Sequence, residues 1–206
     1  MSIIELVFCF VKGQFDQNGL SGYTVCEMSN LQPPIPSASG RRVFAGSAVG
    51  VLVFVIDSQE RLLLLAHPRR KGQWEVINGA LEAGETLLDG VLREVREEAG
   101  PALQVRPLGT VHAYTFWYDD NVQYLLSVCY LLEYQGGQVL PGDDMAGSQV
   151  RWWRLDELND PDVVLVVPRD QKWLAERAVA LYRLWKDAPA VDLQPPLDPK
   201  ARSKYD

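Results

Sequence analysis

Three glutamates lie close together in residues 79–100, a segment that reads GALEAGETLLDGVLREVREEAG. Glu94, Glu97 and Glu98 are spaced at i, i+3 and i+4, so on a helix their carboxylates share one face. Like charges at this spacing repel each other and lower stability. A hard divalent cation, Mg²⁺ or Mn²⁺, removes that penalty because it prefers carboxylate oxygens. The spacing therefore predicts a metal site on a helix, with a solvated acidic face as the alternative.

The helix that carries these acids needs an anchor. Apolar residues recur at three- and four-residue spacing, which predicts one buried stripe. Thr86 is expected to cap the start of the helix with Asp89 as its partner. Gly100 followed by Pro101 is expected to end it. The stripe consists of Leu88, Val91, Leu92, Val95 and Ala99.

The segment resembles the Nudix box, a pattern of Gly, Glu, Arg-Glu, Glu-Glu and Gly at fixed spacing. The one departure inside the box is Pro101, which stands where the family has an aliphatic residue. Upstream, members often read Trp-x-x-Pro-Gly-Gly, whereas this chain reads WEVING, residues 74–79. Asn78 tolerates left-handed backbone, so we expect the loop to be preserved. The matching residues are Gly79, Glu85, Arg93, Glu94, Val95, Glu97, Glu98 and Gly100.

The resemblance implies roles for these residues. Glu94, Glu97 and Glu98 would bind the metal, with one of them, such as Glu97, as candidate base. Glu85 and Arg93 would form an orienting ion pair, with a purely structural role as the alternative. The list of candidate ligands is completed by the Asn78 carbonyl and by Asp144 in LPGDDMAG, where a simple turn is the alternative.

The resemblance also implies an activity: metal-dependent hydrolysis of a nucleoside diphosphate linked to another moiety. Arg70 is a candidate phosphate contact in a basic loop, where solvated charge is the alternative. Trp74 is a candidate substrate contact. Phe116 and Tyr118 fall at an offset that the family associates with dinucleoside polyphosphates, although strand aromatics often only pack the core. Rival activities are a noncatalytic nucleotide-sensing or protein-binding module, and an isomerase, which would need a catalytic Cys.

Composition agrees with a single catalytic domain in a cytoplasmic protein. The net charge of the 206 residues is −7, which argues against nonspecific binding to nucleic acid or anionic membranes. No run approaches the ~18 apolar residues of a membrane helix. The three cysteines lack zinc spacing and suggest buried free thiols.

The order of predicted elements indicates an α/β/α sandwich of the Nudix type with a mixed sheet. Residues 1–40 are expected to form a β-rich extension and a Pro-rich linker, 41–187 the Nudix domain, and 188–206 a disordered tail. Strands 3–12 and 21–28 of the extension suggest a homodimer, with a hairpin that folds back onto its own domain as the alternative. Other expected elements are two strands around Ser58–Glu60, strands at 104–117, 121–134 and 149–154, and a helix over 168–187 with Leu174, Ala178, Leu181 and Leu184 on one stripe.

Overall fold

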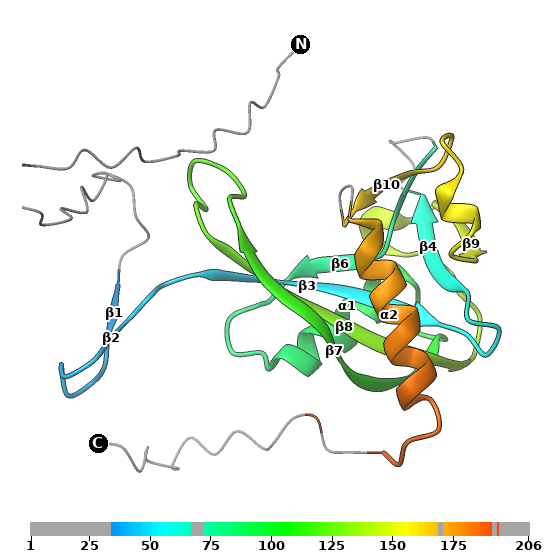
Figure 1. The fold of residues 1–206 in the computed structure, drawn as a ribbon. Helices are drawn as coiled ribbons and strands as arrows, with labels where there is room; N and C mark the ends of the chain where they lie inside the picture. Colours follow the sequence, from blue (N-terminus) through cyan, green and yellow to red (C-terminus); the bar gives the residue numbers. More distant parts are fainter. Residues whose placement is uncertain (1–33, 67–71, 169–170, 191–192, 194–206) are drawn as a thin grey trace, which may run out of the picture. The chain divides into compact units, whose positions relative to one another are not determined.

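The computed structural model describes residues 34–66, 72–168, 171–190 and 193 (Figure 1). The expected N-terminal hairpin, Arg70 and most of the expected tail lie outside these residues. The helices are α1 (Leu87–Glu98) and α2 (Lys172–Trp185), with 3₁₀ turns η1 (Asp143–Met145) and η2 (Glu157–Asn159). The strands are β1 (Ile35–Pro36), β2 (Val43–Phe44), β3 (Ala48–Ile56), β4 (Leu62–Ala66), β5 (Gln73–Glu75), β6 (Ile77–Ala80), β7 (Gln104–Phe116), β8 (Leu125–Gly136), β9 (Gln149–Trp153) and β10 (Val164–Val167).

Eight of these strands form one sheet in the order β10-β5-β4-β3-β8-β7, with β6 also paired to β3 and β9 to β4. The pairs β3–β8 and β10–β5 are parallel, and the remaining pairs are antiparallel. The sheet is therefore mixed, as predicted. β1 and β2 make a separate two-stranded hairpin.

Helices α1 and α2 cover opposite faces of the sheet, and each face has its own hydrophobic core. Figure 1 shows α2 crossing in front of the sheet. Successive residues of β3 serve the two cores in turn because side chains alternate along a strand. This arrangement confirms the α/β/α sandwich. On the α1 face, Val51, Val53 and Val55 pack with Val91, Val95 and Ala99; on the α2 face, Leu52, Phe54 and Ile56 pack with Leu174, Ala178 and Tyr182.

The predicted stripe of α2 was wrong at its C-terminal end. Leu174 and Ala178 are buried, but Leu184 is 73% exposed. At about 100° per residue, the buried side chains of α2 centre between Ala178 and Tyr182, and Leu184 points well away from that direction. Likewise α1 packs Leu87 against its core in place of the predicted Leu88.

Five short strands, β1, β2, β5, β6 and β10, were not predicted, and β8 begins at Leu125 instead of 121. Asn78 belongs to β6, where it pairs with Leu52, so the expected left-handed loop at this position was wrong. The residue is thus held in extended backbone by the sheet. Cys129 is a buried free thiol, as expected, and burial raises its pKa to about 12. None of the helices in the described part of the chain is long and apolar enough to cross a membrane.

Candidate metal centre on helix α1

The ends of α1 are fixed by the residues that the sequence predicts. Thr86 Oγ1 accepts a hydrogen bond from the Asp89 N–H at 3.1 Å and donates one to Asp89 Oδ2 at 2.8 Å. At the other end, Gly100 has φ +99°, a conformation that favours glycine. A side chain there would also press on the Leu140 carbonyl oxygen at 2.5 Å. These contacts set where the acidic side chains of α1 emerge.

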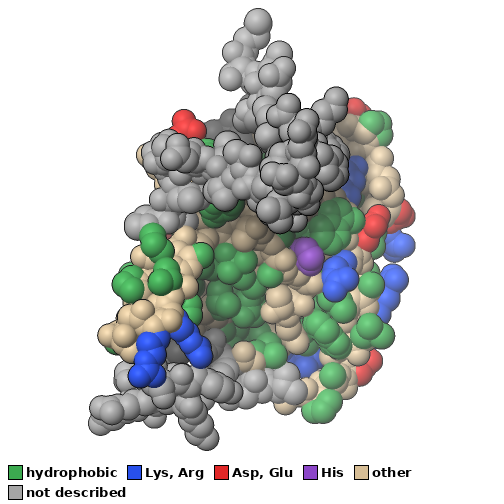
Figure 2. All heavy atoms as spheres, turned by 60° about the vertical axis from the view of Figure 1, so that its left-hand side comes forward, with side chains coloured by type: hydrophobic (Ala, Val, Ile, Leu, Met, Phe, Trp, Pro, Cys, Tyr) green, Lys and Arg blue, Asp and Glu red, His purple; other side chains and the backbone are tan. Residues whose placement is uncertain are grey.

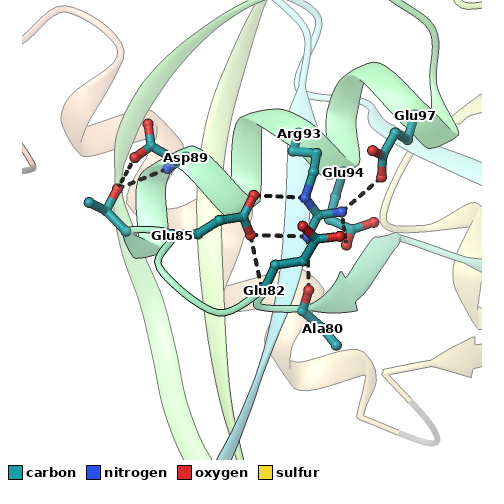
Figure 3. A network of polar contacts seen from close by, with 8 residues as sticks. Ala80, Glu82, Glu85, Asp89, Arg93, Glu94 and Glu97 are labelled. Atoms are coloured by element: carbon teal, nitrogen blue, oxygen red, sulfur yellow. Dashed lines mark hydrogen bonds and ion pairs between the residues drawn. The ribbon is translucent and has the colours of Figure 1, made fainter.

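Arg93 is the centre of a polar network on α1 (Figure 3). Its Nε donates to Glu85 Oε1 at 2.8 Å, which is the predicted ion pair, and Nη2 donates to the Ala80 carbonyl at 2.9 Å. Its Nη1 donates to Glu94 Oε1 and Glu97 Oε2, both at 2.8 Å. The hydrogen bonds that Glu85 accepts from Arg93 and from the Glu82 N–H hold the pKa of Glu85 below its ordinary value. Arg93 therefore fastens both the loop before α1 and two of the predicted ligands.

Glu98 and Glu94 are the buried acids of this helix, each 7% exposed. Glu98 Oε2 accepts the Asn78 N–H at 2.9 Å. The Glu94 carboxylate lies directly against Gly79 of β6, where a methyl group on the glycine would overlap it. The box glycine thus makes room for a box acid, since any larger residue would fill that space.

Burial and neighbouring acids raise the pKa of both side chains. Desolvation is the largest cause, and it brings the pKa of Glu98 to about 8. Glu94, Asp144 and Glu75 add to the rise at Glu98 because they carry like charge. Asp144 comes from η1, which contacts α1 where Gly142 approaches the Glu97 carbonyl. The fold therefore brings the predicted loop acid to the predicted helix acids.

Glu75 is a member of this cluster that the sequence reasoning missed. It lies in β5 and is 3% exposed. Its charge raises the pKa of Glu98, so the two carboxyls are near each other. The sequence could have identified Glu75 from its position between the apolar residues Trp74 and Val76. A buried strand seldom holds a carboxylate without a functional or structural partner.

The chemistry of this donor set suits a hard cation. Four carboxyls repel one another in a partly desolvated place, and oxygen-rich, acidic surroundings are what Mg²⁺ and Mn²⁺ select. Within the described residues, however, no three acids, histidines or cysteines are already grouped as a metal site. Arg93 instead bridges Glu94 and Glu97. The acids are gathered, and Arg93 occupies part of the space between them.

The predicted substrate aromatics lie on β7 and beyond it. His112, Tyr114, Phe116 and Tyr118 form a continuous row, which we call the aromatic row, with ring centroids 5.8–6.4 Å apart. Trp173 of α2 meets the His112 ring edge-on at 5.1 Å. Figure 2 shows hydrophobic side chains gathered across the middle of one side of the molecule.

Exposure differs along this row. Tyr114 packs against the α2 core, whereas Phe116 is 38% and Tyr118 is 61% exposed. The outer two rings are thus available to a ligand. Trp74, the other predicted aromatic contact, packs edge-on against Trp153 at 4.9 Å and belongs to the α2 core. Trp74 therefore packs within the protein in this structure.

An acidic helix docked on one face of a mixed sheet, with a second helix on the opposite face, defines the class of this protein as Nudix-type. The family model for the NUDIX domain matches residues 46–178, more than half of the chain, and the chain belongs to the Nudix family. The family and fold predicted from the box are confirmed, as is membership of an enzyme family.

Among curated relatives, the chain is similar to the NAD-capped RNA hydrolases NudC of Photobacterium profundum and Vibrio parahaemolyticus. The first is 31% and the second 32% identical over 108 residues, which cover 52% of this chain. The match covers only 38% and 39% of the two relatives, so the chain spans less than two fifths of their length.

Solved structures show the same fold. An ADP-ribose pyrophosphatase from Streptococcus suis superposes with a TM-score of 0.52 at 18% identity, over 67% of this chain and 93% of that one. A possible asymmetric diadenosine tetraphosphate hydrolase from Jonesia denitrificans gives 0.52 at 17% identity, over 66% and 94%. At these identities the likeness concerns the fold alone.

Proposed function

We propose that this protein is a divalent-metal-dependent pyrophosphohydrolase that cleaves a nucleoside diphosphate linked to another moiety. The observation that carries the proposal is the acidic cluster, in which Glu94 and Glu98 of α1 and Glu75 of β5 are buried and the exposed Asp144 of η1 lies near them. Three buried carboxyls in one place are expensive for the fold unless a cation binds there. Nudix hydrolases generally use such ions.

Glu94, Glu98 and Asp144 would hold the metal, with Glu97 at the exposed side and the Asn78 carbonyl as a further candidate. A divalent ion bound there withdraws charge from phosphoryl oxygens and lowers the pKa of a bound water. Glu97 is the candidate base because its side chain is 39% exposed and reaches solvent, while Glu98 is enclosed. Arg93 orients Glu97 through a 2.8 Å hydrogen bond and keeps Glu85 beside it.

The substrate side of the proposal rests on the aromatic row. Phe116 and Tyr118 offer exposed rings to a base, and base–aromatic stacking contributes roughly 1–3 kcal/mol. Arg70, outside the described residues, stays a candidate phosphate contact. The relatives' names favour dinucleotide-type substrates; NudC acts on NAD-capped RNA, so a nucleotide attached to RNA joins the candidates despite the chain's net charge of −7.

A substrate panel tests the proposal directly. ADP-ribose, diadenosine tetraphosphate, a UDP-sugar and NAD-capped RNA are incubated with protein and Mg²⁺ or Mn²⁺, and the products are separated by chromatography. We expect hydrolysis of at least one compound, no hydrolysis in EDTA, and a kcat lowered at least ~100-fold in Glu97→Gln and Glu98→Gln. The matched control is Glu176→Gln on the exposed side of α2, which should keep full activity.

A noncatalytic nucleotide-binding module is the second candidate. The hydrogen bonds from Arg93 to Glu94 and Glu97 favour this candidate, because they engage carboxylates that a bound metal would need. Full activity in EDTA, or normal turnover in both glutamine variants, would exclude the metal mechanism. Tight nucleotide binding without turnover of any substrate would instead support the module.

A further inference from the structure

The outer edge of β7 is an open strand edge. β7 is the last strand of the eight-stranded sheet, and among the described residues it pairs only with β8. A strand edge presents N–H and C=O groups that can pair with a further strand. The strand at the opposite edge, β10, has four residues against thirteen in β7, so β7 offers much the longer template.

The first half of this edge is protected by features that natural edge strands use. Pro107 has no N–H to donate to a neighbouring strand, and the register with β8 shifts in two places between residues 107 and 112. The Arg177 side chain of α2 donates from Nε to the Val111 carbonyl at 2.8 Å. Residues 104–111 are therefore poorly suited to accept another strand.

The second half of the edge, residues 112–116, has none of this protection. Its five residues pair with successive residues of β8 without a shift. Their sequence, HAYTF, holds no lysine, acid, proline or glycine that would discourage further pairing. Ala113, Thr115 and Phe116 are exposed, and aromatic and β-branched residues favour strands. This half is a template for one added strand.

The chain contains a segment of the kind that such a template accepts. Residues 3–12, IIELVFCFVK, lie outside the described residues and are apolar at both alternating sets of positions, apart from Glu5 and Lys12. A strand with this pattern needs apolar neighbours on both of its faces. Along residues 112–116 the aromatic row lies on one face, and Ala113 and Thr115 lie on the other.

The route of the chain into β3 favours a second copy as the donor of this segment. β1 and β2, which precede β3, form a sheet of their own, and their side chains Ile35, Val43 and Phe44 are exposed. The chain ahead of β3 thus leaves the eight-stranded sheet instead of extending it. Exchange of identical segments between two copies gives each copy the same contact and closes with twofold symmetry.

We propose that the edge of β7 at residues 112–116 binds residues 3–12 of a second copy of this chain as an added β-strand. Main-chain hydrogen bonds supply the affinity, and the alternating apolar side chains select the register. The assembly does not depend on the metal site, so it stands or falls separately from the hydrolase activity.

Disulfide trapping in the full chain tests this pairing. One cysteine at a time replaces a residue of 112–116, and the donor thiol is Cys9, or Glu5→Cys or Val7→Cys with Cys9→Ser. Cys26→Ser removes one other thiol. Cys129 stays, because it is buried and burial raises its pKa to about 12, which makes it inert.

After oxidation, a non-reducing gel should show two linked chains for a few cysteine pairs only, because only residues directly opposite each other come within reach of a disulfide. The control is Val164→Cys, which is 46% exposed on the other edge strand, β10, and should link no chains. No linked chains for any pair, or linking by the control to the same extent, would overturn the proposal. Disulfides formed only within single chains would show that the segment folds back onto its own domain.

A matched pair of lysine variants gives a second measurement. Thr115 and Thr110 are both exposed on β7, but Thr115 lies in the open half and Thr110 in the protected half. Thr115→Lys places a charge beside the added strand and should raise the dissociation constant of the dimer at least ~10-fold in light scattering, while Thr110→Lys should leave it unchanged. Equal dissociation constants for the two variants, each with a native melting temperature, would contradict the assignment of the edge.

Discussion

Glu98 is the acid whose charge state the fold disturbs most clearly. Its pKa, ordinarily 4.5, rises to about 8 through burial, with help from Glu94, Asp144 and Glu75. The folded protein therefore binds this proton more tightly than the unfolded chain does. The stability that the proton supplies is complete below about pH 4.5 and disappears as pH rises through about 8.

We therefore expect the melting temperature in EDTA to fall between pH 5 and pH 8, and millimolar Mg²⁺ to raise it most at pH 8. The gain at pH 8 should be at least ~3 °C, the effect of about 1 kcal/mol in a domain of this size. Scanning calorimetry at both pH values measures it. Glu98→Gln has no proton to lose, so it should show less pH dependence; a variant that follows the native curve would contradict the assignment.

At the residue scale, the sequence predicted the location of those residues that belong to a motif with regular spacing. Glu94, Glu97 and Glu98 recur at helical intervals, and Glu85 and Arg93 fall at the fixed spacing of the Nudix box, so their shared location was foreseeable. Glu75 stands alone in the sequence, and only the pairing of distant strands shows that it is buried and what lies near it. The bridge from Arg93 to Glu94 and Glu97 was also unforeseen, because spacing alone does not decide which partner a carboxylate takes.

The contact between β6 and α1 gives a prediction at the scale of elements. Gly79→Ala puts a methyl group where the Glu94 carboxylate now lies. The end of a glutamate side chain can move away cheaply, so we expect turnover to fall at least ~10-fold through a displaced ligand, with a melting temperature within about 2 °C of native. The control is Ala80→Gly, one residue along the same strand. Unchanged turnover in Gly79→Ala would show that the position of Glu94 is not critical.

Element prediction succeeded where local signals were strong. The cap at Thr86, the stop at Gly100 and the hairpin around Ser58–Glu60, where Glu60 has φ 61°, all follow from side-chain chemistry near the turn. β5 and β6 were missed because they are three and four residues long, too short for a periodic pattern. Leu184 was assigned to the wrong face because two successive three-residue steps, from Ala178 to Leu181 and from Leu181 to Leu184, each fall short of a 3.6-residue turn and drift around the helix.

At the scale of the whole molecule, we still expect a homodimer that depends on residues 1–30. This segment is apolar and β-like in sequence, and an isolated hairpin is marginal without a partner surface. Light scattering at micromolar concentration should give the mass of two chains, and a chain that begins at residue 34 should give the mass of one. A single-chain mass for the full sequence would end this hypothesis; a dimer of the shortened chain would move the interface elsewhere.

The division of the interior by the sheet has a thermodynamic consequence. Val95 belongs to the core on the α1 face and Leu174 to the core on the α2 face, and the two clusters have no buried residue in common. Free energies of unfolding for changes on the two sides should then be independent. In a double-mutant cycle, Val95→Ala and Leu174→Ala should have a coupling energy below about 0.5 kcal/mol, whereas Leu174→Ala and Ala178→Gly, within one core, should couple more strongly. Denaturant titration of the four proteins in each cycle measures how far the sheet insulates one half of the interior from the other.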